Sequence, residues 1–330
     1  MSLDPSIPVL DISPLLSRAD SVGHLADQIR VACREWGFFY VVGHDVDLQL
    51  IQQLEQVSQQ FFAMGLEDKL AIRMERGGRA WRGYFPLGDE LTSGQPDQKE
   101  GLYFGAELDE DDPRVRAGLP LHGRNLFPEI AGFRETVLGY LTAMTRLGHT
   151  LMEGIALSLG FDTAYFADRY TRDPFILFRI FHYPPLTSQA AESTWSVGEH
   201  TDYGILTILL QDTVGGLQVK SPAGWIAAPP LPGSFVCNIG DMLDRMTGGV
   251  YRSTPHRVLN KSTSGRLSYP FFFDPSFDSE VRPIDSKLIV AEDKLQRWDG
   301  ASVHEFHGTY GDYLLEKVSQ VFPELGQREL

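Results

Sequence analysis

Cysteine is scarce in this sequence, with only Cys33 and Cys237 among 330 residues. Neither lies in the closely spaced pairs that are typical of redox motifs or of cysteine-based zinc sites. Such sparse, unpaired usage indicates a reducing compartment, because disulfides accumulate in oxidising ones. We therefore expect a cytoplasmic protein.

Long apolar runs and an excess of positive charge are also missing. No uninterrupted apolar segment approaches membrane-spanning length, and the start, Met1-Ser2-Leu3-Asp4-Pro5, lacks the basic flank and apolar stretch of a signal peptide. The 44 acidic residues outnumber the 29 basic ones, for a net charge of −15. Because this charge would repel phosphates, we expect no nucleic-acid partner and no anionic membrane partner.

What the sequence does contain is enough apolar material for a sizeable core. It is 42% hydrophobic and 11% aromatic, and its length suits one large domain or two small ones. We see no internal repeat, low-complexity segment or linker, so we expect a single composite domain, 1–330. Its expected parts are a support region with a long substrate-side loop (1–125), a long helix region (126–173), a β core with the metal site (174–285) and a C-terminal segment with a helix (286–330).

Helical spacing of apolar residues marks the supporting layer. It predicts one helix after Ser21 and another from near Asp47, with a buried strand over 38–42 between them. A longer helix is expected from Phe133 to Gly160, and its His149 is interpreted as structural or exposed. A last amphipathic helix is expected over 310–321.

Residues 75–125 lack clear periodicity and are rich in glycine. A long irregular stretch inside a domain is often a binding loop or lid, although a solvated surface loop is the alternative. Its candidates for facing a cleft are Tyr84, Lys99, Glu100 and Phe104. Lys99 and Arg82 could recognise an acidic group, or could simply be exposed charges.

After Pro174 the pattern changes to short strands separated by glycine and proline turns. This pattern is typical of a sandwich or barrel. The predicted strands cover 175–183, 205–211, 217–220, 225–227, 234–239, 253–259 and 266–273.

Metal-ligating residue types cluster within this β region. On an extended strand His200 and Asp202 would share a face, and His256 could complete a three-ligand cap. Two imidazoles and one carboxylate, with the opposite positions open, suit a non-haem Fe(II) that also binds O₂ and a co-substrate. Arg266 and Ser268, again two apart, would present a forked cation and a hydroxyl to a carboxylate.

The combination is more specific than any one motif, since an isolated His-x-Asp means little. His256 follows His200 by 54 residues, and Arg266-Leu267-Ser268 follows ten residues later. Together with segments at matching places along the chain, this signature resembles the Fe(II)/2-oxoglutarate-dependent oxygenase superfamily, in its isopenicillin-N-synthase-like branch. Those segments are Ile7-Pro8-Val9-Leu10-Asp11, Trp36-Gly37-Phe38-Phe39, Asp97-Gln98-Lys99-Glu100, Tyr183-Pro184-Pro185, Gly215-Gly216-Leu217-Gln218-Val219, Asn238-Ile239-Gly240-Asp241 and Tyr251-Arg252-Ser253.

The resemblance implies a mainly β fold with flanking helices, namely a distorted double-stranded β-helix, or jelly roll. It implies that His200, Asp202 and His256 hold Fe(II). It further implies that Arg266, Ser268 and Tyr183 bind 2-oxoglutarate, which is consumed with O₂ to give succinate and CO₂ as a small organic substrate is hydroxylated or desaturated. Plant members often carry asparagine two places before the tyrosine, where this chain has Phe181, so part of the contact set there stays open.

The substrate side is predicted from strand alternation. A regular strand would place Gly204, Leu206 and Ile208 on the face of His200, and Pro270 and Phe272 on that of Arg266. Such apolar walls suit a small organic substrate, although they equally resemble a core. The expected substrate-side residues are Tyr84, Lys99, Phe104, Phe181, Leu206 and Phe272.

Other functions remain open at this point. An oxidase related to isopenicillin N synthase would use the same iron ligands without 2-oxoglutarate, and an ethylene- or succinate-forming variant would fragment 2-oxoglutarate itself. A non-catalytic metal-binding β-barrel is a remote alternative, because structural zinc usually has four protein ligands, often cysteine. Neither cysteine lies near the motif in the sequence.

Overall fold

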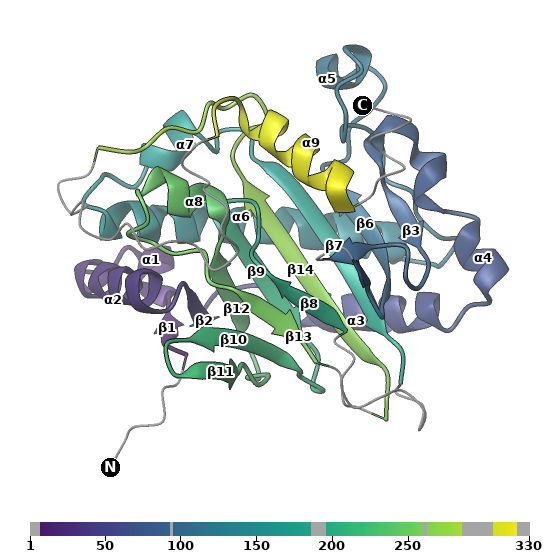
Figure 1. The fold of residues 1–330 in the computed structure, drawn as a ribbon, viewed down its shortest axis with the longest axis horizontal. Coiled ribbons are helices and arrows are strands. Elements are labelled where there is room, and N and C mark those ends of the chain that lie inside the picture. Colours follow the sequence, from purple (N-terminus) through teal and green to yellow (C-terminus); the bar gives the residue numbers. More distant parts are fainter. Residues whose placement is uncertain (1–6, 93–94, 186–195, 260–262, 286–305, 322–330) are drawn as a thin grey trace.

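The computed structural model describes residues 7–92, 95–185, 196–259, 263–285 and 306–321, and two β-sheets form its centre (Figure 1). The larger sheet has eight strands, in the spatial order β1 (Val9–Asp11), β2 (Phe38–Val42), β12 (Phe235–Ile239), β9 (Leu206–Gln211), β14 (Arg266–Asp274), β7 (Phe175–Tyr183), β6 (Glu100–Gly105) and β3 (Gly83–Phe85). The smaller sheet has four, β11 (Gly224–Ala227), β10 (Leu217–Ser221), β13 (His256–Val258) and β8 (Val197–His200). Two further short strands, β4 (Leu91–Thr92) and β5 (Gln95–Pro96), pair with each other.

All neighbours in these sheets are antiparallel except β1 and β2. The smaller sheet covers one face of the larger one, and the long helix α6 (Phe133–Ser158) crosses the other face (Figure 1). Two facing antiparallel sheets with helices outside form a distorted jelly roll, so the predicted fold class is confirmed.

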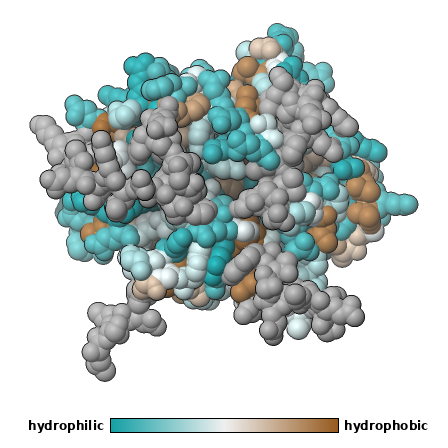
Figure 2. Space-filling model, in the orientation of Figure 1, coloured by the Kyte–Doolittle hydropathy of each residue, from teal (hydrophilic) through white to brown (hydrophobic). Residues whose placement is uncertain are grey.

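The remaining helices lie around this sandwich. They are α1 (Ser13–Ser17), α2 (Val22–Glu35), α3 (Leu48–Phe62), α4 (Leu66–Leu70), the 3₁₀ helix η1 (Met74–Ala80), α5 (Pro113–Arg116), α7 (Tyr165–Arg169), α8 (Asp241–Met246) and α9 (Tyr310–Val321). No helix in the described ranges is both long and apolar enough to cross a membrane. On the face drawn in Figure 2, hydrophobic residues occur in small separate groups among hydrophilic ones.

The helices of the supporting layer begin and end where the sequence predicts. Asp47 caps α3, with its carboxylate accepting a hydrogen bond from the Gln49 backbone N–H at 2.8 Å. Gly37 follows α2 at φ +63°, and its N–H returns to the Ala32 carbonyl. Only glycine fits this turn comfortably, because a Cβ there would lie 2.2 Å from the Arg252 carbonyl oxygen.

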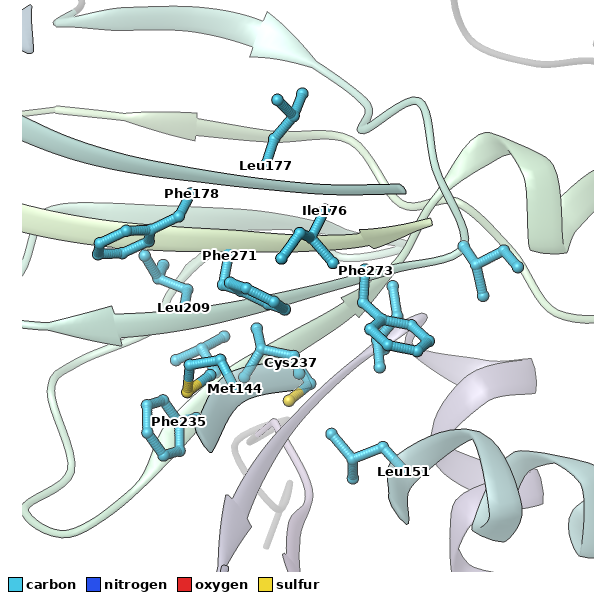
Figure 3. Close-up of a cluster of buried hydrophobic side chains, with 14 of the residues drawn as sticks. Met144, Leu151, Ile176, Leu177, Phe178, Leu209, Phe235, Cys237, Phe271 and Phe273 are labelled. Atoms are coloured by element: carbon cyan, nitrogen blue, oxygen red, sulfur yellow. The ribbon is translucent and has the colours of Figure 1, made fainter. Parts of the chain in front are cut away.

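Strand alternation separates the core from the interior of the sandwich. On β7 and β14, Phe178, Phe271 and Phe273 point to the layer of α6 and pack with its apolar side chains, including Met144 and Leu151 (Figure 3). The residues between them on each strand face the smaller sheet. One face of the larger sheet therefore builds the core, and the other is free to build a site.

The interpretation of 75–125 as an irregular loop is wrong for much of its length. This stretch contributes β3 and β6 to the larger sheet, and β6 pairs with β7 along its whole length. Glycines and a proline obscured these strands in the sequence. Pairing with neighbouring strands, which is a long-range effect, overrides weak local propensity.

The contact between α6 and β14 provides a test of the packing. A Cβ on Gly148 would lie 2.3 Å from Cδ2 of Phe273, whereas one on Gly139 of the same helix would meet only an ordinary contact at 3.5 Å. We expect Gly148→Ala to lower the free energy of unfolding by about 1–3 kcal/mol through overpacking. Gly139→Ala, as the matched control, should raise it by up to about 1 kcal/mol. Urea denaturation of both variants measures this, and equal effects would contradict the close packing.

Candidate metal centre

Three potential metal ligands meet between the two sheets. His200 and His256 are direct cross-strand partners on β8 and β13, with ring centroids 4.2 Å apart. Oδ1 of Asp202 lies 3.9 Å from Nε2 of His200 and 3.7 Å from Nε2 of His256. One ligand atom from each residue lies within 4.8 Å of the others, so the three could hold one ion.

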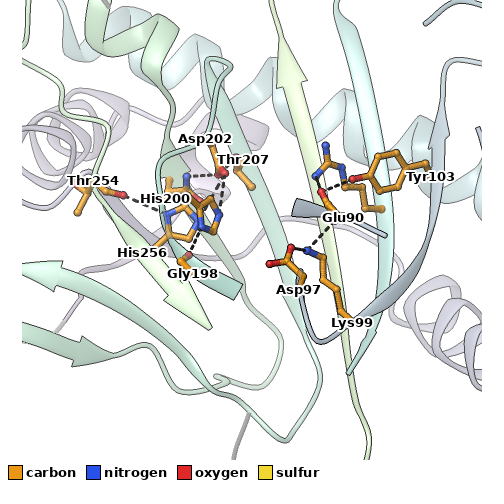
Figure 4. Close-up of polar contacts among 12 residues, drawn as sticks. Glu90, Asp97, Lys99, Tyr103, Gly198, His200, Asp202, Thr207, Thr254 and His256 are labelled. Atoms are coloured by element: carbon orange, nitrogen blue, oxygen red, sulfur yellow. Dashed lines mark hydrogen bonds and ion pairs between the residues drawn. The ribbon is translucent and has the colours of Figure 1, made fainter. Parts of the chain in front are cut away.

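Hydrogen bonds orient each ligand toward that common point (Figure 4). Nδ1 of His200 lies 2.8 Å from the Gly198 carbonyl, and Nδ1 of His256 lies 3.3 Å from the Thr254 carbonyl. With Nδ1 donating its proton there, each Nε2 keeps a lone pair for a metal.

The carboxylate of Asp202 is held in the same way. Its Oδ2 accepts hydrogen bonds from Thr207 Oγ1 at 2.5 Å and from Asn238 Nδ2 at 2.7 Å. Oδ1 is thereby directed at the imidazoles. These supporting contacts fit a metal ion better than they fit an ordinary buried ion pair.

The protonation states also suit a metal. Burial would raise the pKa of Asp202, but the two histidines and the hydrogen bonds from Asn238 and Thr207 outweigh it, so the pKa lies below its usual value. Burial, aided by His200, lowers the pKa of His256 to about 4. Near neutral pH Asp202 is ionised and His256 neutral, which are the forms that bind a metal.

The predicted strand through the motif is only partly present. β8 ends at His200, and residues 201–205 form a turn that leads into β9 of the other sheet. The alternation therefore does not continue across the turn: Thr207 and Leu209 line the cavity beside the metal ligands, while Leu206 and Ile208 lie in the core. The prediction that Leu206 is on the substrate side is wrong for this reason.

Arg266, Ser268 and Tyr183 line one part of the same cavity. Arg266 is paired with Tyr183 across β14 and β7, and its guanidinium carbon lies 4.6 Å from the tyrosine ring centroid. The side chain is buried, with Nε and Nη1 bonded to nothing within the described part of the chain. A buried guanidinium with open donors fits a carboxylate such as that of 2-oxoglutarate.

Four of the other residues predicted to line the substrate side do line the cavity. Pro270 and Phe272 on β14, Phe181 on β7, and Lys99 line the cavity as expected. Lys99 is buried rather than exposed.

Three candidates from 75–125 lie elsewhere, so their predicted position is wrong. Tyr84 and Glu100 are on the opposite face of the sheet, where the tyrosine hydroxyl donates to Glu100 Oε2 at 2.6 Å. Phe104 stacks in the core against Phe127, with centroids 5.5 Å apart. The cause is strand geometry, because successive residues of β6 point to opposite faces: Glu100 and Phe104 share the face away from the cavity, and Tyr84 lies on that face of the paired strand β3.

Arg82 and His149 have structural roles. Arg82 is buried and does not line the cavity of His200, Asp202 and His256, and its Nη2 donates to the Leu121 carbonyl at 2.7 Å, so the idea that it recognises an acidic group at this site is wrong. His149 is half-buried with its ring 4.9 Å from that of Phe273, which agrees with the structural interpretation.

Several cavity residues escaped the sequence analysis, notably Glu90, Tyr103 and Arg179. The sequence did contain a signal for Arg179 and Tyr103, namely strand alternation. Counting back by twos from Tyr183 along β7 reaches Phe181 and then Arg179, and counting on from Lys99 along β6 reaches Tyr103. Glu90 lies beside β4 and β5, which are too short to show a periodic signal in the sequence.

A buried carboxyl group links the turn at 201–205 to the C-terminal helix α9. Asp274 accepts hydrogen bonds from the Ile205 backbone N–H at 3.2 Å and from the Tyr310 hydroxyl of α9 at 2.5 Å. It reaches the turn because Gly204 has no side chain: a Cβ there would overlap the carboxylate. Burial raises the pKa of Asp274 to about 7.

This raised pKa makes a prediction about stability. Between the usual pKa of 3.8 and about 7, the unfolded state loses its proton while the folded state keeps it. The free energy of unfolding of the metal-free parent protein should therefore fall as the pH rises from 4 to 7, by up to about 4 kcal/mol. The Asp274→Asn variant, which lacks this titrating group, should not show that decrease. Urea denaturation at pH 5 and pH 8 measures the difference.

Asp312, in the first turn of α9, provides a control of opposite sign. Hydrogen bonds from the backbone N–H and hydroxyl of Thr309 lower its pKa. Its stabilising effect is present above the unfolded pKa, so Asp312→Asn should be less stable than the parent at neutral pH. If the free energy of unfolding changed with pH in the same way in the two variants, the pH-dependent loss of stability could not be assigned to Asp274.

Comparison with known proteins agrees with this geometry. Residues 7–130 match the family described as non-haem dioxygenase in morphine synthesis N-terminal, and residues 174–275 match the 2OG-Fe(II) oxygenase superfamily. A protein of Dictyostelium discoideum named "Probable iron/ascorbate oxidoreductase" is 52% identical, with 91% of this chain and 90% of that protein covered. A homoarginine-6-hydroxylase of Glycine max is 37% identical, with 97% and 98% covered.

Solved structures show the same fold. A full-length protein of Neurospora crassa, crystallised in complex with alpha-KG and 5-formyluracil, superposes with a TM-score of 0.78 at 28% identity, covering 95% of this chain and 96% of that one. The chain therefore belongs to the 2OG-Fe(II) oxygenase superfamily. It is a 2-oxoglutarate-dependent non-haem iron dioxygenase, and its predicted cofactors, Fe(II) and 2-oxoglutarate, are confirmed at the level of the family.

Proposed function

We propose that His200, Asp202 and His256 hold the Fe(II) of this enzyme. The observation that carries the assignment is the convergence of Oδ1 and two Nε2 atoms on one point, each fixed from behind by a hydrogen bond. With only these three protein ligands, a bound Fe(II) would keep coordination positions for the co-substrate and O₂.

We further propose that Arg266, Ser268 and Tyr183 bind the distal carboxylate of 2-oxoglutarate. Nε and Nη1 of Arg266, which have no hydrogen-bond partner in the described chain, support this role, because the carboxylate of 2-oxoglutarate would accept hydrogen bonds from both. When bound, iron and 2-oxoglutarate supply the oxidising chemistry, with succinate and CO₂ as products. The chain's own residues hold Asp202 ionised and His256 neutral, orient the co-substrate and line a cavity with apolar walls.

The reaction we propose is hydroxylation, with desaturation as the alternative, of a small organic molecule. The cavity, with Trp81, Leu121 and Phe272 among its apolar residues, supports a small organic substrate. The names of the relatives support the same class, since one of them is a hydroxylase of the amino acid homoarginine. Homoarginine is accordingly the first compound to test.

The experiment combines anaerobic calorimetry with a product assay. We expect 2-oxoglutarate titrated into the Fe(II) protein to bind at one site, and succinate to form when O₂ is admitted. A silent titration with iron still bound would favour the oxidase without 2-oxoglutarate. Ethylene in the headspace would instead indicate fragmentation of 2-oxoglutarate.

We also propose two general properties of the protein: that the chain forms one composite domain, and that it is cytoplasmic. The first proposal is supported by β1, β2, β3 and β6 of the N-terminal region, which are strands of the same sheet as the core; residues 286–305 of the expected C-terminal part lie outside the described residues. The second is supported by Cys33 and Cys237, which are both free and buried.

A further inference from the structure

Arg179 is a partly buried cation that neither the proposed metal site nor the proposed co-substrate site uses. It lies on β7 and lines the cavity on the same strand face as Phe181 and Tyr183. It stands four positions before Tyr183, which is about 13 Å along a strand. Arg179 is therefore too far along the sheet to share the carboxylate that we assign to Arg266.

The guanidinium of Arg179 sits close to the metal ligands. Its carbon lies 4.8 Å from the ring centroid of Phe272, and Phe272 pairs across the sheet with Thr207, which donates to Asp202. A group bound to Arg179 would thus lie in the cavity that His200, Asp202 and His256 also line.

Neighbouring side chains hold the guanidinium of Arg179 in place, but not all of its N–H groups have a hydrogen-bond acceptor. Its carbon lies 4.3 Å from the ring centroid of Tyr103, and Nη1 donates to Glu90 Oε1 at 3.2 Å. Of the five N–H groups of an arginine, Nε has no partner within the described residues although the side chain is only 15% exposed. An unpaired buried donor is costly unless a ligand supplies the acceptor.

The acidic residues nearby do not offer an equivalent site for a cation. Glu90 accepts from the Tyr103 hydroxyl at 2.6 Å and lies 2.8 Å from Lys99 Nζ, in addition to its contact with Arg179. Asp97 is paired with Lys99 as well (Figure 4). These two carboxylates are neutralised by the two cations, and Lys99 is occupied by both of them.

Arg179 also stays charged under all ordinary conditions. Burial alone would lower its pKa, but Tyr103, Glu90, Tyr203 and Asp202 outweigh burial and raise it above its usual value. A permanent cation with open donors recognises a carboxylate through paired hydrogen bonds.

We propose that Arg179 binds a carboxylate of the substrate, so that the enzyme oxidises a small organic acid such as a free amino acid. This inference rests on the proposed function, with Arg266 reserved for 2-oxoglutarate. The body of the acid would lie against Trp81, Leu121, Leu177 and, from α9, Leu314, all of which line the cavity. Arg179 would act as a specificity-determining residue.

The test compares acids with their uncharged counterparts. Protein loaded with Ni(II) and 2-oxoglutarate is titrated calorimetrically with L-homoarginine, other free amino acids and simple alkyl and aryl carboxylates, each beside its methyl ester. We expect one or more acids to bind and their esters to bind at least about 30-fold more weakly, as expected when a buried charge pair is lost. Arg179→Met should weaken acid binding by a similar factor and remove the difference between acid and ester.

A second variant separates recognition from folding. Arg179→Lys keeps the charge but not the planar fork, so it should bind the acid with intermediate affinity; 2-oxoglutarate titration of each variant reports whether the co-substrate site is intact. The proposal is overturned if no acid binds, if esters bind as well as acids, or if Arg179→Met retains full acid affinity. Failure of the proposed function is a different result, because 2-oxoglutarate itself would then not bind to the parent protein.

Discussion

Asp202→Ala should abolish Fe(II) binding and turnover while leaving the fold largely intact. The substitution removes the one anionic ligand, so a divalent cation loses both one of its three protein ligands and the negative charge that attracts it. It also leaves Thr207 and Asn238 without the acceptor that they share, so a moderate loss of stability is expected. Anaerobic calorimetry with Fe(II), succinate formation and a circular dichroism melt measure the three quantities.

Thr207→Val is the matched control for this variant. It removes only the hydrogen bond to Oδ2 of Asp202 and keeps the ligand itself. Loss of such a supporting contact typically costs about 10–100-fold in metal affinity or activity, so the Asp202 variant should lose clearly more. Full iron binding by Asp202→Ala would remove this residue from the ligand set, and collapse of its fold would favour a structural metal.

Arg266→Met should weaken 2-oxoglutarate binding by about 2–5 kcal/mol, which is at least about 30-fold. The guanidinium is buried, and two of its nitrogens have no partner in the described chain, so they are available to a carboxylate. In the methionine variant the co-substrate carboxylate would be buried without the cation that neutralises it. Iron affinity should be retained, because Arg266 donates to none of the three ligands within the described residues. Calorimetric titration of 2-oxoglutarate into the anaerobic Fe(II) protein measures the change.

The same substitution at Arg257 controls for loss of charge alone. Arg257 lies on β13 beside His256 but stacks on Trp225, with its guanidinium carbon 3.8 Å from the ring centroid. Arg257→Met should leave the affinity for 2-oxoglutarate within about twofold, as expected of a partly exposed cation outside the cavity. Equal losses in the two variants would indicate a general electrostatic effect and would count against a specific role for Arg266.

The sequence determined those features that depend on short-range patterns. The apolar stripes of α2, α3 and α6, the β-branched and aromatic runs of β2, β7 and β14, and the spacing from Arg266 to Ser268 all arise within one element, where periodicity fixes which side chains share a face. The motif around His200, Asp202 and His256 identified the family in the same way, because the chemistry requires those residue types.

Only the tertiary structure decided how the separate elements meet. The turn at 201–205 moves the chain from one sheet to the other, which reverses the expected facing of Leu206. Pairing with β7 makes the residues after Lys99 a strand, β6, and Phe104 of this strand and Tyr84 of its neighbour β3 join the core. Neither event leaves a local signal, since hydrogen bonds between strands join residues far apart in the sequence. For the same reason Arg179 became recognisable as a cavity-lining cation with an open Nε donor only when its neighbours on β6, β14 and the turns were in place.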